Sequence, residues 1–241
     1  MPASTQQPPL TAPALPSESR NLEPVGRDTL QSQIVAQLQE RLITGKFHPG
    51  EKLTLRGLAK SLGTSLMPVR DALQHLQSIG ALDVQPNRTV IVPILNAEEI
   101  LELSDIRCAL EGIAAERAAR AIDSAGIRLL WEKYARMENL REHYGQVPYL
   151  YAHWDLHMTI AQLSQANMLV TMLKSIWLRI GPIVRPSPEK YHNVERSLHD
   201  HHAIVQAIVG HDAKAAQQAI VSDIREFFAA IVPLYEALPR Q

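Results

Sequence analysis

The sequence lacks several features that mark common protein classes. It has one cysteine in 241 residues, Cys108, which excludes an internal disulfide framework and suits a reducing compartment. No uninterrupted apolar run approaches the roughly 18 residues of a membrane-spanning helix. The N-terminal stretch has no basic segment followed by an apolar core, as a secretory signal would. We therefore expect a soluble, cytoplasmic protein.

Aromatic residues are also scarce, at 5%, whereas Leu, Ile, Val and Ala dominate an apolar fraction of 46%. This composition favours helices, and the length gives room for one large domain or two modest ones. Residues 1–25 are rich in proline, serine and glutamine, so we expect a disordered tail there.

The net charge is only −1, which by itself argues against a nucleic acid partner, but the charge is unevenly distributed. Residues 26–95 hold eight Lys/Arg against five Asp/Glu, and residues 96–241 hold fifteen against eighteen. The first segment therefore has the sign expected of a DNA-binding module attached to another unit.

The basic segment has the pattern of three short helices and a hairpin. A four-residue apolar spacing predicts the first helix, through Leu30, Ile34, Leu38 and Leu42. Asp28 is its expected N-cap, and Gly45 its expected end. Thr54 and Ser65 are N-caps for the next two helices, which a tight Gly-containing turn separates. Two short β-runs flank residues 86–88. The order predicts a winged helix-turn-helix, with a generic three-helix bundle as the alternative.

The stretch LITGKFHPGEKLTLRGLAKSLGTSLMPVRDALQHLQSIGAL resembles the winged helix-turn-helix of the GntR family. The shared marks are the G-x-x-x-PG-x-x-L spacing, the LA-x-x-LG-x-S turn, and PVR-[DE]-AL followed by a glycine. The likeness covers residues 28–93, and we assign residues 26–93 to a DNA-binding domain. The family implies a dimeric, ligand-controlled transcription factor that binds a double-stranded DNA operator.

The resemblance also implies the residues that contact DNA. Arg56 and Arg70 would bind phosphates or guanines, Ser65 would contact a phosphate where the recognition helix starts, and Arg88 would lie on the wing. Met67 belongs to the same DNA-contacting turn as Ser65.

Two positions depart from the family pattern. Leu66 stands where many relatives carry a basic residue, and Thr89 stands where the wing usually has a glycine. Because neither Leu66 nor Met67 can donate a hydrogen bond, part of the expected base readout is missing.

Residues 96–236 read as helix throughout, beginning with a capping box formed by Asn96 and Glu99. Six helices with no strand signal predict one α-bundle. The expected fold class is therefore mainly α: an N-terminal winged helix-turn-helix, with three helices and a small β-hairpin, joined to a six-helix α-bundle.

Several ionisable side chains fall on inward faces of this bundle. His153 and His157 are four residues apart on one helix face, and His201 and Asp223 lie on the apolar stripes of two later helices. A lone inward histidine is more often a core residue, but four such groups favour a shared metal site. By the same geometry, three other groups project away (Asp155, His199 and His202).

This half resembles the FCD ligand-binding domain found in the FadR-like branch of the GntR family. The matching pieces are Arg107-x-x-Leu110-Glu111, the run through His157, Ser164 and Asn167, and SLHDHHAIVQAI. The family's metal positions hold His153, His157, His201 and Asp223 here, so its first aspartate has become histidine and its last histidine aspartate. The donors suit Zn²⁺, Ni²⁺ or Mn²⁺, and we assign residues 96–236 to effector binding and dimerisation.

Arg107 lies on the same inward stripe as Leu103, Ile106, Leu110 and Ala114, so we expect its guanidinium to face the metal cavity. Two interpretations remain open: a structural ion pair with Glu111 or another acid, and bidentate capture of an effector carboxylate.

We therefore expect a homodimeric DNA-binding transcriptional regulator, not an enzyme, controlled by a small carboxylate metabolite at a metal-containing site. The alternative is a metal-dependent enzyme carrying a vestigial DNA-binding module, which would need a spare acid or base beside the metal. Only Glu111 could serve as one. A third interpretation is a purely structural ion with the effector bound elsewhere.

Overall fold

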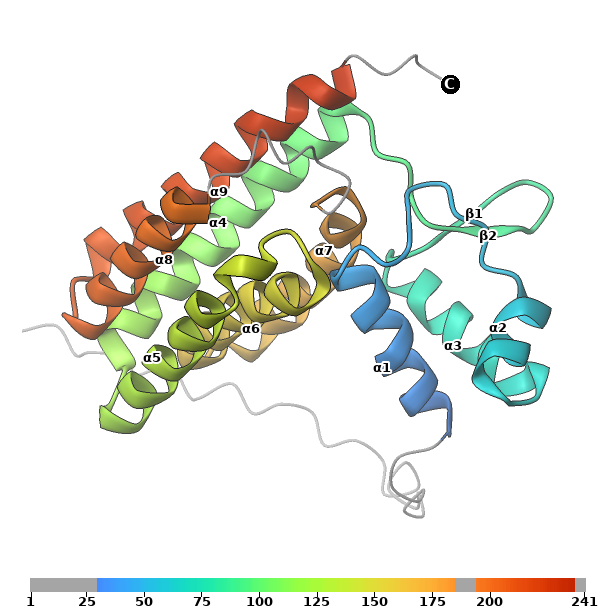
Figure 1. Cartoon of the computed structure of the whole chain (residues 1–241), viewed down its shortest axis with the longest axis horizontal. Helices are drawn as coiled ribbons and strands as arrows, with labels where there is room; N and C mark the ends of the chain where they lie inside the picture. The colour runs from blue at the N-terminus through green and yellow to red at the C-terminus, as the bar shows by residue number, and fades with distance from the viewer. Residues whose placement is uncertain (1–29, 185–193, 237–241) are drawn as a thin grey trace, which may run out of the picture.

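The computed structural model describes residues 30–184 and 194–236. Its N-terminal unit consists of three helices and a two-stranded sheet, to the right in Figure 1. In chain order these are α1 (Leu30–Ile43), α2 (Leu55–Leu62), α3 (Leu66–Ser78), β1 (Asp83–Val84) and β2 (Val90–Ile91). The expected tail, residues 1–25, and the Asp28 cap lie outside the described residues.

Capping side chains and left-handed residues shape the helix-turn-helix. The Thr54 hydroxyl accepts a hydrogen bond from Gly57 N, and Gly63 ends α2 with φ of 62°. Ser65 is the N-cap of α3, but its side chain makes no capping hydrogen bond. In the hairpin, Arg88 takes the left-handed conformation, with φ of 62°. The left-handed conformation of this turn therefore falls on Arg88, and position 89 does not have to be a glycine.

The N-terminal core forms where α1 packs on α3, around buried residues such as Leu38, Leu42 and Leu76. Leu30, the first residue of the predicted apolar spacing, is half exposed because it starts the described helix, ahead of the part that packs. The two strands are antiparallel, with Asp83 opposite Ile91. These elements confirm the winged helix-turn-helix.

The described residues of the C-terminal unit form six helices, namely α4 (Ala97–Ala121), α5 (Ser124–Asn139), α6 (Val147–Leu163), α7 (Asn167–Val184), α8 (Val194–Val209) and α9 (Ala213–Glu236), with a short 3₁₀ turn at Arg141–His143. Figure 1 shows α4 and α9 lying antiparallel along each other, with α8 beside α9. The Asn96–Glu99 capping box starts α4 as expected. The predicted bundle is confirmed, and none of the described helices is long and apolar enough to cross a membrane.

Helix α7 joins the two units. Its Leu178 is buried in the N-terminal core, and its Arg179 donates a 2.7 Å hydrogen bond to the carbonyl of Gly80, just after α3. At Gly181 the helix comes so close to the end of α1 that an added Cβ would lie 2.1 Å from the carbonyl oxygen of Leu42. The C-terminal helical unit is thus packed directly against the N-terminal unit.

Candidate metal centre

Three helices bring His153 and His157 of α6, His201 of α8 and Asp223 of α9 together. One ligand atom from each residue lies within 4.8 Å of the other three. His157 and His201 are buried, while Asp223 keeps 13% of its side chain exposed. Each residue occupies the inward face of its helix, as its sequence spacing predicts, and the packing of the three helices brings the four residues together.

Hydrogen bonds fix the orientation of two of the imidazoles. The Nδ1 atom of His157 lies 2.6 Å from a carboxylate oxygen of Glu111, and the Nδ1 atom of His201 lies 2.6 Å from the carbonyl oxygen of Ser197. Both partners are acceptors, so each Nδ1 carries the hydrogen. The Nε2 atoms of the two rings are left 3.0 Å apart.

This Nε2 pair is the observation that fits a metal ion. In neutral rings with hydrogen on Nδ1, both Nε2 atoms present lone pairs, which repel at 3.0 Å unless a cation lies between them. Two nitrogens bound to one ion through bonds of about 2.1 Å are themselves about 3.0–3.4 Å apart. A carboxylate or carbonyl behind each ligating histidine is also a usual feature of metal sites.

Electrostatics keep the donors in the required protonation state. Burial, reinforced by His157, His201 and Arg107, lowers the pKa of His153 well below its usual range. Burial likewise lowers the pKa of His201, although Asp223 opposes the shift. Burial alone would raise the pKa of Glu111, but Arg107 and His157 outweigh it and hold that pKa at about 2. His153 and His201 are therefore neutral, and Glu111 is ionised, at neutral pH.

Arg107 makes the ion pair with Glu111 and also keeps a free donor. Its Nε lies 2.6 Å from the Glu111 carboxylate, and its guanidinium carbon stands 4.1 Å from the centre of the Trp177 ring. Its Nη2 is buried without a hydrogen-bond partner among the described residues. Ile106, predicted on the same inward stripe, is 38% exposed, because the buried face of α4 runs instead through Arg107, Cys108 and Glu111.

The residues expected to point away from the centre have other surroundings. His199 is exposed, and His202 packs against Trp131 and Tyr134. Asp155 pairs with Lys133 at 2.8 Å. These residues offer natural controls for substitutions at the centre.

Sequence reasoning missed the contact from Glu111 to His157, which comes from a different helix. The sequence suggests Glu111 only as a partner of Arg107 or as a spare acid. The signal that could have found it is chemical, since a ligating histidine needs an acceptor at its second nitrogen.

The predicted DNA-contacting residues all lie on the surface. Arg56, Ser65, Met67, Arg70 and Arg88 are exposed. Within the described ranges, the three arginines form no ion pair, so their charges are available to a polyanion.

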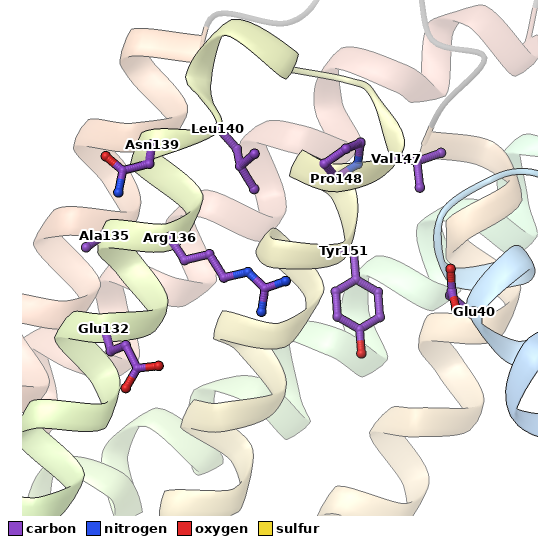
Figure 2. A pocket seen from close by; sticks show the side chains of 9 residues that line it. All are labelled: Glu40, Glu132, Ala135, Arg136, Asn139, Leu140, Val147, Pro148 and Tyr151. Carbon is purple, nitrogen blue, oxygen red and sulfur yellow. The ribbon is translucent and has the colours of Figure 1, made fainter.

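Two surface pockets among the described residues lie away from the candidate centre. One of about 680 Å³ lies where α1 meets α5 and α6, lined among others by Glu40, Arg136 and Tyr151. Figure 2 shows the Arg136 side chain extending toward the ring of Tyr151 there. The other, of about 430 Å³, lies between α4 and α9 beside Cys108. Burial raises the pKa of that thiol, so it stays protonated at neutral pH.

Both halves of the chain match known families. Residues 30–92 match the bacterial regulatory proteins of the gntR family. Residues 102–226, more than half of the chain, match the FCD domain.

Individual relatives match over most of their length. The HTH-type transcriptional regulator McbR of Escherichia coli (strain K12) is 25% identical over 209 residues, which cover 86% of this chain and 95% of McbR. The gluconate operon transcriptional repressor of Bacillus licheniformis is 24% identical over 205 residues, covering 80% and 82%. The solved structure of E. coli McbR/YncC shares the fold, with a TM-score of 0.79 at 24% identity, over 86% of this chain and 99% of that one.

Proposed function

The chain belongs to the GntR family of bacterial regulatory proteins, in the branch that carries an FCD domain, and from this membership we propose that its DNA binding responds to an organic acid held at a metal centre. That the protein is a DNA-binding transcriptional regulator follows from the family. The alternative of a metal-dependent enzyme is set aside, because the relatives are regulators. We expect the protein to act in the cytoplasm, where the bacterial chromosome lies.

In this proposal α3 enters the major groove of the operator. Arg70 and Arg56 neutralise phosphates or bind guanine edges, and Arg88 extends the contact from the wing. A phosphate contact by Ser65 is supported by its hydroxyl, which makes no capping hydrogen bond and can donate to a phosphate. Met67 is 63% exposed in the first turn of α3, the part of a recognition helix that meets the bases.

The metal ligands in the proposal are His153, His157, His201 and Asp223. The facing Nε2 atoms of His157 and His201 are the observation that supports it most. Three imidazoles and one carboxylate, with no thiolate, suit Zn²⁺, Ni²⁺ or Mn²⁺. When bound, such an ion supplies positive charge and open coordination positions for an oxygen ligand.

Arg107 would give the effector its second anchor. Its buried Nη2 has no partner among the described residues, and a buried unpaired donor costs about 1–3 kcal/mol. A carboxylate near the metal ligands could accept from Nη2 while Nε keeps its bond to Glu111. The ion pair and the capture of an effector, open alternatives in the sequence, are therefore compatible.

Helix α7 is the element that carries the response to DNA in this proposal. The Trp177 ring lies 5.4 Å from the His157 ring and beneath Arg107. The next two residues, Leu178 and Arg179, contact the DNA-binding unit through its core and through Gly80. A ligand that moves Trp177 would therefore shift the end of α3 through one rigid helix, and a differential affinity of a few kcal/mol suffices to change operator occupancy.

We also propose a homodimer, which supplies two recognition helices for a two-fold operator. Support comes from an exposed apolar patch, formed by Ile106 and Ile113 of α4 with Met168 and Met172 of α7. These side chains are 38%, 45%, 77% and 51% exposed. Helices α4 and α7 contact each other directly, and exposed apolar side chains on two neighbouring helices are of the kind that a two-fold dimer interface covers.

A screen of small carboxylic acids tests the proposal. Full-length protein loaded with Zn²⁺, Ni²⁺ or Mn²⁺ is unfolded thermally with each acid, and operator affinity is measured in parallel by fluorescence anisotropy. An effector at about 100 times its Kd should stabilise the loaded protein by about 2.7 kcal/mol, or roughly 5–11 °C, and should change operator affinity.

The Arg107→Lys variant provides the control for the second anchor. It keeps the positive charge beside Glu111 but loses the planar guanidinium with its several donors. The effector should therefore bind at least tenfold more weakly, while metal content stays the same. If no acid distinguishes the metal-loaded from the metal-free protein, and none alters operator affinity, the effector proposal fails.

A further inference from the structure

The first turn of α3 presents two large apolar side chains to solvent. Leu66 is 43% exposed and Met67 is 63% exposed, whereas the opposite face of the helix is buried (Val69, Ala72, Leu73 and Leu76). Neither side chain contributes to the core of the N-terminal unit. Apolar surface at this place is therefore available for a partner.

The surroundings of these two residues identify the partner as duplex DNA. Arg70 follows Leu66 by four residues and Met67 by three, so it shares their face of the helix. Arg70 is exposed, as are Arg56 on α2 and Arg88 in the hairpin. An apolar tip framed by unpaired cations is complementary to a groove with phosphates on both sides, and less so to an apolar protein surface.

Only one group in the major groove is apolar. Guanine, cytosine and adenine present hydrogen-bonding groups there, whereas thymine also presents its C5-methyl group. A leucine or methionine side chain can make van der Waals contact with that methyl but cannot satisfy the polar edges of the other bases. A hydrogen-bonding side chain in the same turn would have the opposite preference.

We propose that Leu66 and Met67 determine operator specificity by contacting the C5-methyl groups of thymines in each half-site. At these two positions, apolar contacts to bases replace the hydrogen bonds that polar side chains would make. Arg70, one turn later, keeps the phosphate or guanine contact. The inference rests on the proposed entry of α3 into the groove, but it requires neither the metal nor the effector.

The test removes methyl groups from the DNA one at a time. Operators are first selected from random duplexes with the full-length protein, and each thymine is then replaced by deoxyuridine, which keeps base pairing and the minor groove. At one or two thymines in each half-site, the wild-type affinity should fall about fourfold, the factor that corresponds to about 0.8 kcal/mol per buried methylene.

Substitutions in the protein assign the effect to these side chains. In Leu66→Ala or Met67→Ala the deoxyuridine penalty should vanish at one thymine while other thymines keep theirs, a coupling that a double-mutant cycle measures. Both residues are exposed, so the variants should fold, which circular dichroism checks. Leu129→Ala, at an exposed leucine of α5, is the matched control and should leave the wild-type pattern unchanged.

The outcomes separate the two levels of the inference. If deoxyuridine is tolerated everywhere, or if its penalty persists in both alanine variants, methyl readout by these residues is wrong. If Arg70→Ala binds every duplex as well as the wild type does, then α3 is not the reading helix and the underlying placement is wrong as well.

Discussion

Replacing Gly181 by alanine tests the contact that joins α7 to α1. The added Cβ would lie 2.1 Å from the carbonyl oxygen of Leu42 and 2.6 Å from that of Ile43. Carbon and oxygen atoms normally stay about 3.3 Å apart, and a backbone carbonyl cannot rotate away. The two helices must therefore separate by roughly 1 Å.

The size of the effect follows from this separation. Overpacking of this kind costs about 1–3 kcal/mol, and a chain of this length loses about 2–4 °C of Tm for each kcal/mol. Calorimetry should therefore show a Tm lower by roughly 2–12 °C. Metal content should not change. The effector-dependent change in operator affinity should become smaller, because α7 is no longer packed closely against the DNA-binding unit.

Gly112→Ala on α4 is the matched control. The atoms its Cβ would meet belong to side chains, with Val221 nearest at 3.2 Å, and these can shift by a few tenths of an ångström. Alanine also favours the helix over glycine by roughly 0.8–1 kcal/mol. An unchanged Tm and an unchanged effector response in Gly181→Ala would refute the close contact and its role.

Three further predictions concern other parts of the molecule. Glu111→Gln should lower metal affinity by about 10–100-fold in a chelator competition, because it weakens the acceptor behind His157; unaltered affinity would show that this contact does not support the site. Met172→Lys should shift the protein from dimer to monomer in analytical ultracentrifugation, because it places a charge in the apolar patch; a dimer of wild-type strength would move the interface elsewhere. Arg70→Ala should weaken binding to all duplexes and flatten its salt dependence by about one unit of slope, and an undiminished slope would remove Arg70 from the phosphate contacts.

Much of the fold could be predicted from the sequence, because local signals determine it. The caps at Thr54 and Asn96 and the apolar spacing of each helix are readable within short windows. The same spacing puts His153, His157, His201 and Asp223 on inward faces. Their convergence to within 4.8 Å is a tertiary fact that periodicity alone could not give.

The contacts that lead from the candidate centre to the N-terminal unit could not be predicted in this way. Glu111 reaches His157 across 46 positions of sequence, and Leu178 completes a core whose other members come from the N-terminal unit. Nothing in the sequence near Gly181 explains a glycine within a helix. The explanation is the close approach of α1, which leaves no room for a Cβ. Such features depend on how helices pack, which single-sequence patterns do not encode.

Metal stoichiometry tests the central claim most directly. The full-length protein is stripped with chelator, reloaded with Zn²⁺, Ni²⁺ or Mn²⁺, desalted and analysed for bound metal. The account predicts one ion per chain for the wild type and for the His199→Ala control, which alters an exposed histidine outside the centre. It predicts loss of that ion in His157→Ala, which removes one of the two facing Nε2 atoms. Substoichiometric metal in the reloaded wild type, or full retention in His157→Ala, would contradict the account and make these residues core histidines.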